Sequence, residues 1–137
     1  MTWPRVDGLR ALGLGEPGRM RAELNALVLA GRKRATAGLL DADYRDEDEA
    51  LEVVGERLVL VDDDDRRLAL VEVTDVRVVR FDEVTDDFAR AEGEGFEDRE
   101  DWARAHRAFW QRSGTTVDGD TEVVCLRFTL VSTAAEP

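Results

Sequence analysis

Acidic residues divide this chain into short apolar segments, and this limits which elements can form a buried core. Asp and Glu dominate three stretches, at residues 41–52, 62–65 and 82–101. Residues 41–49 are too polar and too acidic to pack, so we expect an exposed, mobile loop there. The four successive aspartates at 62–65 are typical of a solvated turn, because they lack the ligand spacing and central glycine of a calcium loop. The core must therefore come largely from the segments between these stretches.

The apolar segments predict a β-sheet. Residues 56–61 and 68–73 have the composition of paired strands joined by the acidic turn, and residues 76–81 continue the sheet. Residues 121–131 show the alternation of a half-buried strand. One set of side chains is Val124, Leu126, Phe128 and Leu130, and the other is Val123, Cys125, Arg127 and Thr129. A short extended segment is expected to end at residue 40, starting at or just after Thr36.

Three other segments predict helices. Apolar residues between 20 and 28 fall at helical spacing, and Gly31 is placed to end that helix. A second helix is expected over residues 82–90, with acidic residues in its first turn. The third, over residues 99–112, carries one broad face made of Trp102, Ala105, His106, Phe109 and Trp110. Strands and helices together predict an α+β fold.

The length of the chain suits one domain. With 137 residues and 43% hydrophobic content, residues 1–137 can form one core, preceded by a Gly- and Pro-punctuated lead along the surface at residues 1–18. No apolar run approaches the roughly 20 residues of a membrane span, and the first residues do not begin a signal peptide. The lone Cys125 fits a reducing compartment. We expect a cytoplasmic protein that does not bind membranes.

The charge of the chain restricts its partners. A net charge of −12 argues against duplex DNA and against a broad nucleic-acid-binding surface, because affinity for phosphates comes largely from Lys and Arg. Basic residues nevertheless cluster at 19–34 and at 104–112. If folding brings the two clusters together, they form a positive cleft suited to a short ligand. The oligomeric state is left open.

Lys33 is the only lysine in a chain with eighteen arginines. Lysine can lose its proton and arginine cannot, so Lys33 marks a position that needs this chemistry, or else a solvated helix end. A desolvated lysine three residues before the Thr36 hydroxyl can act as a base, a hydrogen-bond donor or an oxyanion clamp. Its place just after a helix C-terminus favours the charged form.

Several segments occur in an order that resembles the ASCH domain family. They are residues 14–16, 27–36, 54–56, 81–84 and 91–95, then Trp102 with His106 and Phe109, and finally residues 125–128. The resemblance covers most of the chain. It implies a small PUA-like mixed β-barrel flanked by helices, with a ligand cleft beside the barrel and single-stranded RNA or a small nucleoside as the ligand.

The resemblance also implies site residues. Family members are linked to RNA binding, to ribonuclease action and to removal of acyl groups from the exocyclic amine of cytidine. In the amidase branch a lysine, a threonine three residues later and a distant glutamate carry the chemistry, and Lys33, Thr36 and Glu94 match these positions. The chain departs from the family at Gly38, where an arginine is common, so substrate contacts at that position do not carry over.

These residues suit hydrolysis. Thr36 can attack or orient a water, Lys33 can accept a proton or stabilise an oxyanion, and Glu94 can pass a proton to the leaving amine. In a ribonuclease, Lys33 and Arg32 would instead hold phosphate while Glu94 acted as base or held a divalent metal. No other cofactor or metal site is expected. His106 is the only imidazole, which excludes a two-histidine ribonuclease mechanism.

Other residues are candidates for substrate binding, namely Arg32, Arg34, Tyr44, Glu92, Trp102 and His106. Alternative interpretations remain for two of them, because Tyr44 can simply anchor its loop and His106 can be hydrogen-bonded beneath the tryptophans of its helix. Whether Glu92 or Glu94 faces the cleft is open. We expect a hydrolase acting on RNA or a modified nucleoside; the alternative is a noncatalytic RNA-binding or nucleotide-sensing module.

Overall fold

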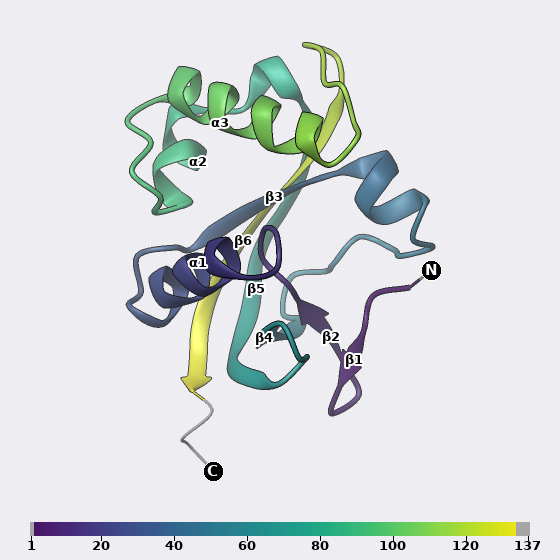
Figure 1. Ribbon diagram of the computed structural model, residues 1–137, viewed down its shortest axis with the longest axis vertical. Coiled ribbons are helices and arrows are strands. Elements are labelled where there is room, and N and C mark those ends of the chain that lie inside the picture. The colour runs from purple at the N-terminus through teal and green to yellow at the C-terminus, as the bar shows by residue number, and fades with distance from the viewer. Residues whose placement is uncertain (1, 134–137) are drawn as a thin grey trace.

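The computed structural model describes residues 2–133, which form a mixed sheet with helices packed on it (Figure 1). The elements are, in chain order, β1 (Arg5–Val6), β2 (Leu9–Leu12), α1 (Arg19–Leu29), β3 (Ala35–Leu39), the π-helix η1 (Leu40–Arg45), β4 (Arg57–Val61), β5 (Arg67–Arg80), the 3-10 helix η2 (Phe81–Glu83), α2 (Asp86–Ala91), α3 (Arg99–Arg112) and β6 (Glu122–Thr133).

The described strands form one six-stranded sheet in the order β1-β2-β4-β5-β6-β3. Neighbouring strands are antiparallel except β2 and β4, which run parallel. Register shifts at Leu70/Val71 and Val73/Asp75 interrupt the long β5–β6 pairing, and such irregularities bend strands and increase twist. The fold is α+β, as predicted. The sheet resembles a barrel only loosely, because β1 and β3 are its two edges and do not pair with each other.

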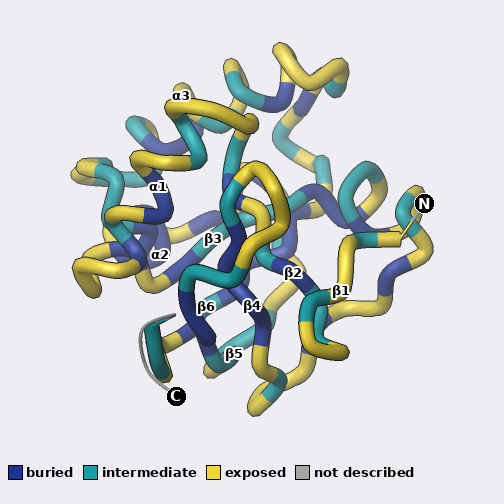
Figure 2. The backbone as a smooth tube through the Cα atoms, turned by 60° about the horizontal axis from the view of Figure 1, so that its bottom comes forward, coloured by how far each residue is buried: buried dark blue, intermediate teal, exposed yellow. Residues whose placement is uncertain are grey.

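Two apolar clusters lie on opposite faces of β6. Val123 and Cys125 pack with the cluster under α2 and α3, whereas Leu126 and Phe128 pack with the cluster under α1, as the alternation of a strand requires. Figure 1 shows α2 and α3 together at one end of the molecule and α1 across the middle of the sheet. Buried positions follow the central strands in Figure 2. The two helical layers therefore stand apart, with β3 between them.

Most predicted elements are present with small shifts. The helix expected over residues 20–28 is α1, and Gly31 follows it with a φ of 77°. The helix expected over 99–112 is α3 with the same bounds, and the last strand is β6. The second and third strands expected in the sheet are one continuous strand, β5.

Three predictions differ from the structure. Residues 1–18 are not only a surface lead, because β1 and β2 join the sheet and both Ala11 and Leu14 are buried. The acidic segment 41–49 is not an exposed loop, because it contains η1 and buries Tyr44. Ion pairs link these two differences, because Arg5 and Arg10 of the lead pair with Glu49 and Glu56, which follow η1. The helix expected over 82–90 is divided into η2 and α2.

The turn after α2 brings residues 92–95 against the segment that follows α1. Gly93 has a φ of 69°, and a Cβ built on it would lie 2.1 Å from the main-chain oxygen of Arg32. Only glycine permits this approach. The close contact places Glu92 and Glu94 beside Lys33.

Replacing Gly93 by Ala should therefore disrupt this contact. Gly95→Ala is a matched control, because Gly95 also has a positive φ of 95° but a Cβ there meets nothing within 4 Å. Both variants carry the left-handed penalty of about 1–2 kcal/mol, and Gly93→Ala adds an overpacking cost of about 1–3 kcal/mol. Urea unfolding measures the difference; equal losses in the two variants would contradict the packing described.

Candidate active site

Two adjoining cavities lie between the N-terminal segment, β3 and α3. The larger has a volume of about 350 Å³ and the smaller about 80 Å³. They share six lining residues, which are Leu14, Gly15, Thr36, Ala37, Phe109 and Trp110. We call the two together the cleft. Lys33, Glu92, Glu94 and His106 line only its smaller cavity.

Lys33 lies at the base of the smaller cavity and is 2% exposed. Its Nζ donates to Glu94 Oε2 at 2.7 Å, to Glu92 Oε1 at 3.1 Å and to the Glu92 main-chain oxygen at 3.4 Å. An ammonium group has three donors, so all three are used. Lys33 therefore has no N–H left for a substrate while these contacts persist.

The same contacts decide the charge of Lys33. Burial alone would lower its pKa, but the charges of Glu92 and Glu94 and their hydrogen bonds outweigh it and raise the pKa above the ordinary value. A group with a raised pKa stays protonated at neutral pH and is a poor proton acceptor. Of the roles considered for Lys33, the geometry favours that of a fixed cation over that of a base.

Glu92 is 1% exposed and joins three side chains. Its Oε1 accepts from Lys33, while its Oε2 accepts from the indole N–H of Trp102 and lies 3.0 Å from His106 Nε2. Burial would raise the pKa of Glu92, but the charges of Lys33 and His106 lower it to about 2. Glu92 therefore serves as the buried counter-ion of the site, and Glu94 is the more accessible carboxylate.

His106 and Trp102 support this counter-ion. Their rings stack with centroids 4.2 Å apart, and His106 Nδ1 lies 2.9 Å from the Trp102 main-chain oxygen. Trp102 is fully buried and lines neither cavity, so it cannot touch a ligand in the cleft. His106 has both ring nitrogens next to acceptors, although its ring reaches the smaller cavity.

Glu94 and Thr36 are the polar side chains of the smaller cavity that remain open to a ligand. The Glu94 side chain is 19% exposed and lines the smaller cavity. Thr36 projects from β3 where the two cavities meet, and within residues 2–133 its hydroxyl takes part in no hydrogen bond. A carboxylate held by a cation and a free hydroxyl thus face the same cavity.

The remaining candidates lie elsewhere. Arg32 and Arg34 are exposed and line neither cavity. Tyr44 is buried and lines the larger cavity, where its hydroxyl donates to Glu52 Oε1 at 2.8 Å. The structure thus groups Lys33, Thr36, Glu92, Glu94 and His106, and sets Tyr44 at the other end of the cleft.

The lining residues that the sequence did not suggest include Trp3, Asp43 and Glu52. Asp43 and Glu52 belong to the acidic segment that appeared too polar to pack, and Trp3 to the supposed surface lead. The only local signal was the single tyrosine inside the acidic segment.

Between residues 2 and 133, no group of three or more His, Cys, Asp or Glu side chains has an arrangement suited to a metal ion. No helix in that part of the chain is long and apolar enough to cross a membrane.

Lys33→Met tests the ion pair, because it removes the cation and keeps an apolar side chain of similar length. The buried Glu92 then lacks its counter-charge, and we expect the free energy of unfolding to fall by about 3–5 kcal/mol. Adding Glu92→Gln removes the uncompensated charge and should recover part of this loss. Urea unfolding of the single and double variants measures both effects. A loss below about 1 kcal/mol, or no recovery in the double variant, would refute the assignment.

Comparisons with known proteins agree with this architecture. The ASCH domain of Lactobacillus crispatus JV V101 is 28% identical, with a TM-score of 0.77 over 89% of this chain and 79% of its own. A DUF984 protein from Enterococcus faecalis V583 is also 28% identical, with a TM-score of 0.77 over 89% of this chain and 76% of its own. No curated protein matches the sequence. The ASCH domain family model matches residues 11–132, and the chain therefore belongs to the ASCH domain family.

Proposed function

We propose that this protein hydrolyses an amide bond of a small, uncharged, nucleoside-type ligand bound in the cleft. One observation supports the proposal: Glu94 and Thr36 line the same cavity. The Glu94 carboxylate is paired with Lys33, and the Thr36 hydroxyl forms no hydrogen bond within residues 2–133. An N4-acylated cytidine is the ligand class that the family resemblance suggests. A cytoplasmic location, which the unpaired Cys125 favours, would suit such a ligand.

The charges of the cleft support an uncharged ligand rather than an RNA strand. Phosphate binding needs available cations. Lys33 is saturated by two carboxylates, and Arg32 and Arg34 lie outside the cleft. Arg21 lines the larger cavity, but its guanidinium donates to the main-chain oxygens of Leu14 and Gly15. The proposal therefore favours amide hydrolysis over ribonuclease action.

The chemistry uses Glu94 as the proton carrier. Glu94 accepts a proton from a water that the Thr36 hydroxyl orients, and the water oxygen forms a bond to the acyl carbon. Glu94 then gives that proton to the leaving nitrogen as the carbon–nitrogen bond breaks. The products are a carboxylic acid and the free amine. Lys33 acts through Glu94, because it holds the carboxylate toward the cavity.

One observation favours a second candidate, a noncatalytic nucleoside-binding module. The Lys33 ammonium has no donor left for the oxyanion that forms during amide hydrolysis. In that case the same cleft would bind a ligand without changing it.

An assay of purified protein separates these functions. The substrates are N4-acetylcytidine and a short single-stranded RNA, each with and without Mg²⁺. We expect release of acetate and cytidine, and a fall in kcat of roughly 100-fold or more in Glu94→Gln because a general acid–base group is lost. Thr36→Val should also lower kcat.

Glu97→Gln is the matched control, because Glu97 is exposed in the same loop and lines neither cavity. It should retain wild-type kcat. Cleavage of the RNA instead of the nucleoside would refute the amidase assignment. Binding of N4-acetylcytidine without turnover would favour the second candidate.

A further inference from the structure

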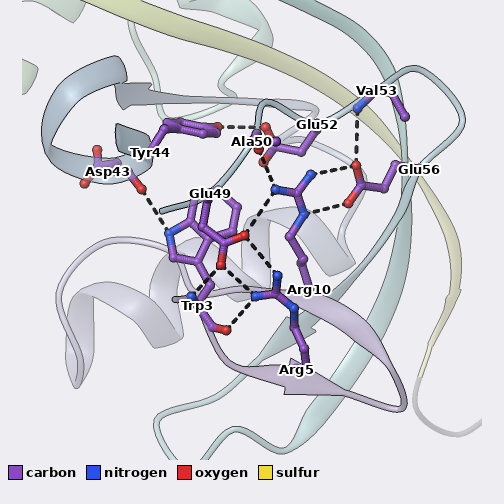
Figure 3. A network of polar contacts seen from close by, with 10 residues as sticks. All are labelled: Trp3, Arg5, Arg10, Asp43, Tyr44, Glu49, Ala50, Glu52, Val53 and Glu56. Carbon is purple, nitrogen blue, oxygen red and sulfur yellow. Dashed lines mark hydrogen bonds and ion pairs between the residues drawn. The ribbon is translucent and has the colours of Figure 1, made fainter. Parts of the chain in front are cut away.

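Four of the carboxylic acids that follow β3 lie beside the N-terminal segment, and they differ in how their charge is neutralised (Figure 3). Two of them, Glu49 and Glu56, pair with arginines of the N-terminal segment. Arg5 donates to Glu49 at 2.7 Å, and Arg10 donates to Glu56 at 2.7 Å. The Arg5 hydrogen bond lowers the pKa of Glu49 to about 2. Neither Glu49 nor Glu56 lines the larger cavity.

The other two acids, Asp43 and Glu52, line the cavity and have no such partner. The Asp43 carboxylate accepts one hydrogen bond, from the Leu39 main-chain N–H at 2.7 Å, while the Asp43 main-chain oxygen accepts from the Trp3 indole N–H at 3.0 Å. Glu52, which is 4% exposed, accepts one side-chain hydrogen bond, from the Tyr44 hydroxyl at 2.8 Å. Among residues 2–133 neither forms an ion pair. Burial is the main cause that raises the pKa of both groups.

This contrast suggests that Asp43 and Glu52 are kept for a ligand. A carboxyl group has about four acceptor sites, so each retains unused capacity toward the cavity. Two arginines lie close by, yet they pair with the acids that do not line the cavity. A ligand that carries hydrogen-bond donors would satisfy the acceptor sites that remain on Asp43 and Glu52.

The sizes of the two cavities indicate which part of a ligand would lie beside Asp43 and Glu52. The smaller cavity, about 80 Å³ beside Glu94, holds little more than an acyl group. The rest of a nucleoside would therefore occupy the larger cavity of about 350 Å³. Aromatic rings of Trp3 and Tyr44, 5.0 Å apart, form part of its wall and can pack against the apolar faces of a ring.

Gly38 leaves the approach to these acids open. It lines the larger cavity, and a Cβ at this position would lie 3.2 Å from Tyr44 Cε1 and 3.3 Å from Asp43 Oδ2. A side chain here would crowd Asp43 and Tyr44. The small residue therefore keeps one acceptor accessible.

We propose that Asp43 and Glu52 line a sugar subsite and accept hydrogen bonds from hydroxyl groups of the ligand's ribose. The nucleoside class rests on the function proposed above. A carboxylate that accepts from a ribose hydroxyl is a recurrent arrangement in nucleotide-binding proteins. The subsite selects ribonucleosides over deoxyribonucleosides by binding, independently of any hydrolysis.

Calorimetric titration of the wild-type protein with cytidine, 2′-deoxycytidine and 3′-deoxycytidine tests the subsite. None of the three carries an acyl group, so the result does not depend on turnover. We expect cytidine to bind about tenfold more tightly than either deoxynucleoside, since each loses one hydrogen bond to a charged group. Asp43→Asn and Glu52→Gln should reduce this preference to within about twofold.

Asp41→Asn is the matched control, because Asp41 lies in η1, is exposed and lines neither cavity. It should keep the full preference. Equal unfolding midpoints of the variants would show that each is folded. No measurable cytidine binding, no preference for ribose, or a preference that persists in both Asp43→Asn and Glu52→Gln would overturn the subsite. If N4-acetylcytidine is not hydrolysed but the preference holds and depends on these acids, the proposed hydrolysis fails and the subsite stands.

Discussion

A buried ammonium group organises one end of this protein. Lys33 is surrounded by the end of α1, by β3 and by the turn after α2, and it is stabilised there only because two carboxylates reach it. One of these, Glu92, is in turn held by Trp102 and His106 of α3. Ion pairs and hydrogen bonds therefore connect helices that belong to two separate apolar clusters. Apolar side chains alone do not fill the space between these clusters. The smaller cavity lies at that boundary.

The cleft is asymmetric in its electrostatics. At the smaller cavity every hydrogen-bond donor of Lys33 is used, and the groups that remain available are Glu94 and Thr36. At the larger cavity Asp43 and Glu52 offer hydrogen-bond acceptors, because the nearby arginines bind other acids. A ligand for this cleft should therefore bring donors to one end and a reactive carbonyl to the other. An anionic ligand would meet uncompensated carboxyl groups, which disfavours phosphate-bearing molecules.

Local patterns in the sequence predicted much of the fold, and the exceptions share a cause. The alternation at 121–131 and the aromatic spacing at 99–112 are visible within a single element, and both elements are present. The acidic segment after β3 seemed unable to pack because its charges were considered alone. Arg5 lies 44 residues from Glu49, and only the folded chain reveals that the two neutralise each other. The β2–β4 pairing also joins distant parts of the sequence, since Ala11 pairs with Val59.

The sequence likewise predicted only part of the candidate site. Lys33, Thr36 and Glu94 could be selected because composition and family resemblance pointed to them. The structure adds that Lys33 is already paired with two carboxylates, which favours a fixed cation over a base among the roles considered for it. Asp43 and Glu52 could not be selected, since nothing local separates them from the other acids around them. Their distinction is the absence of an ion pair among the described residues, which is a property of the tertiary structure.

The most direct test of this account uses the fact that Lys33 is the only lysine. Protein labelled with nitrogen-15 and carbon-13 in lysine alone gives a single side-chain signal, whose position reports the protonation of Nζ during a pH titration by NMR. We expect an ammonium signal that persists from about pH 6 to beyond the ordinary lysine pKa of about 10.4. A titration of that signal between about pH 6 and pH 9 would contradict it and return Lys33 to the role of a general base.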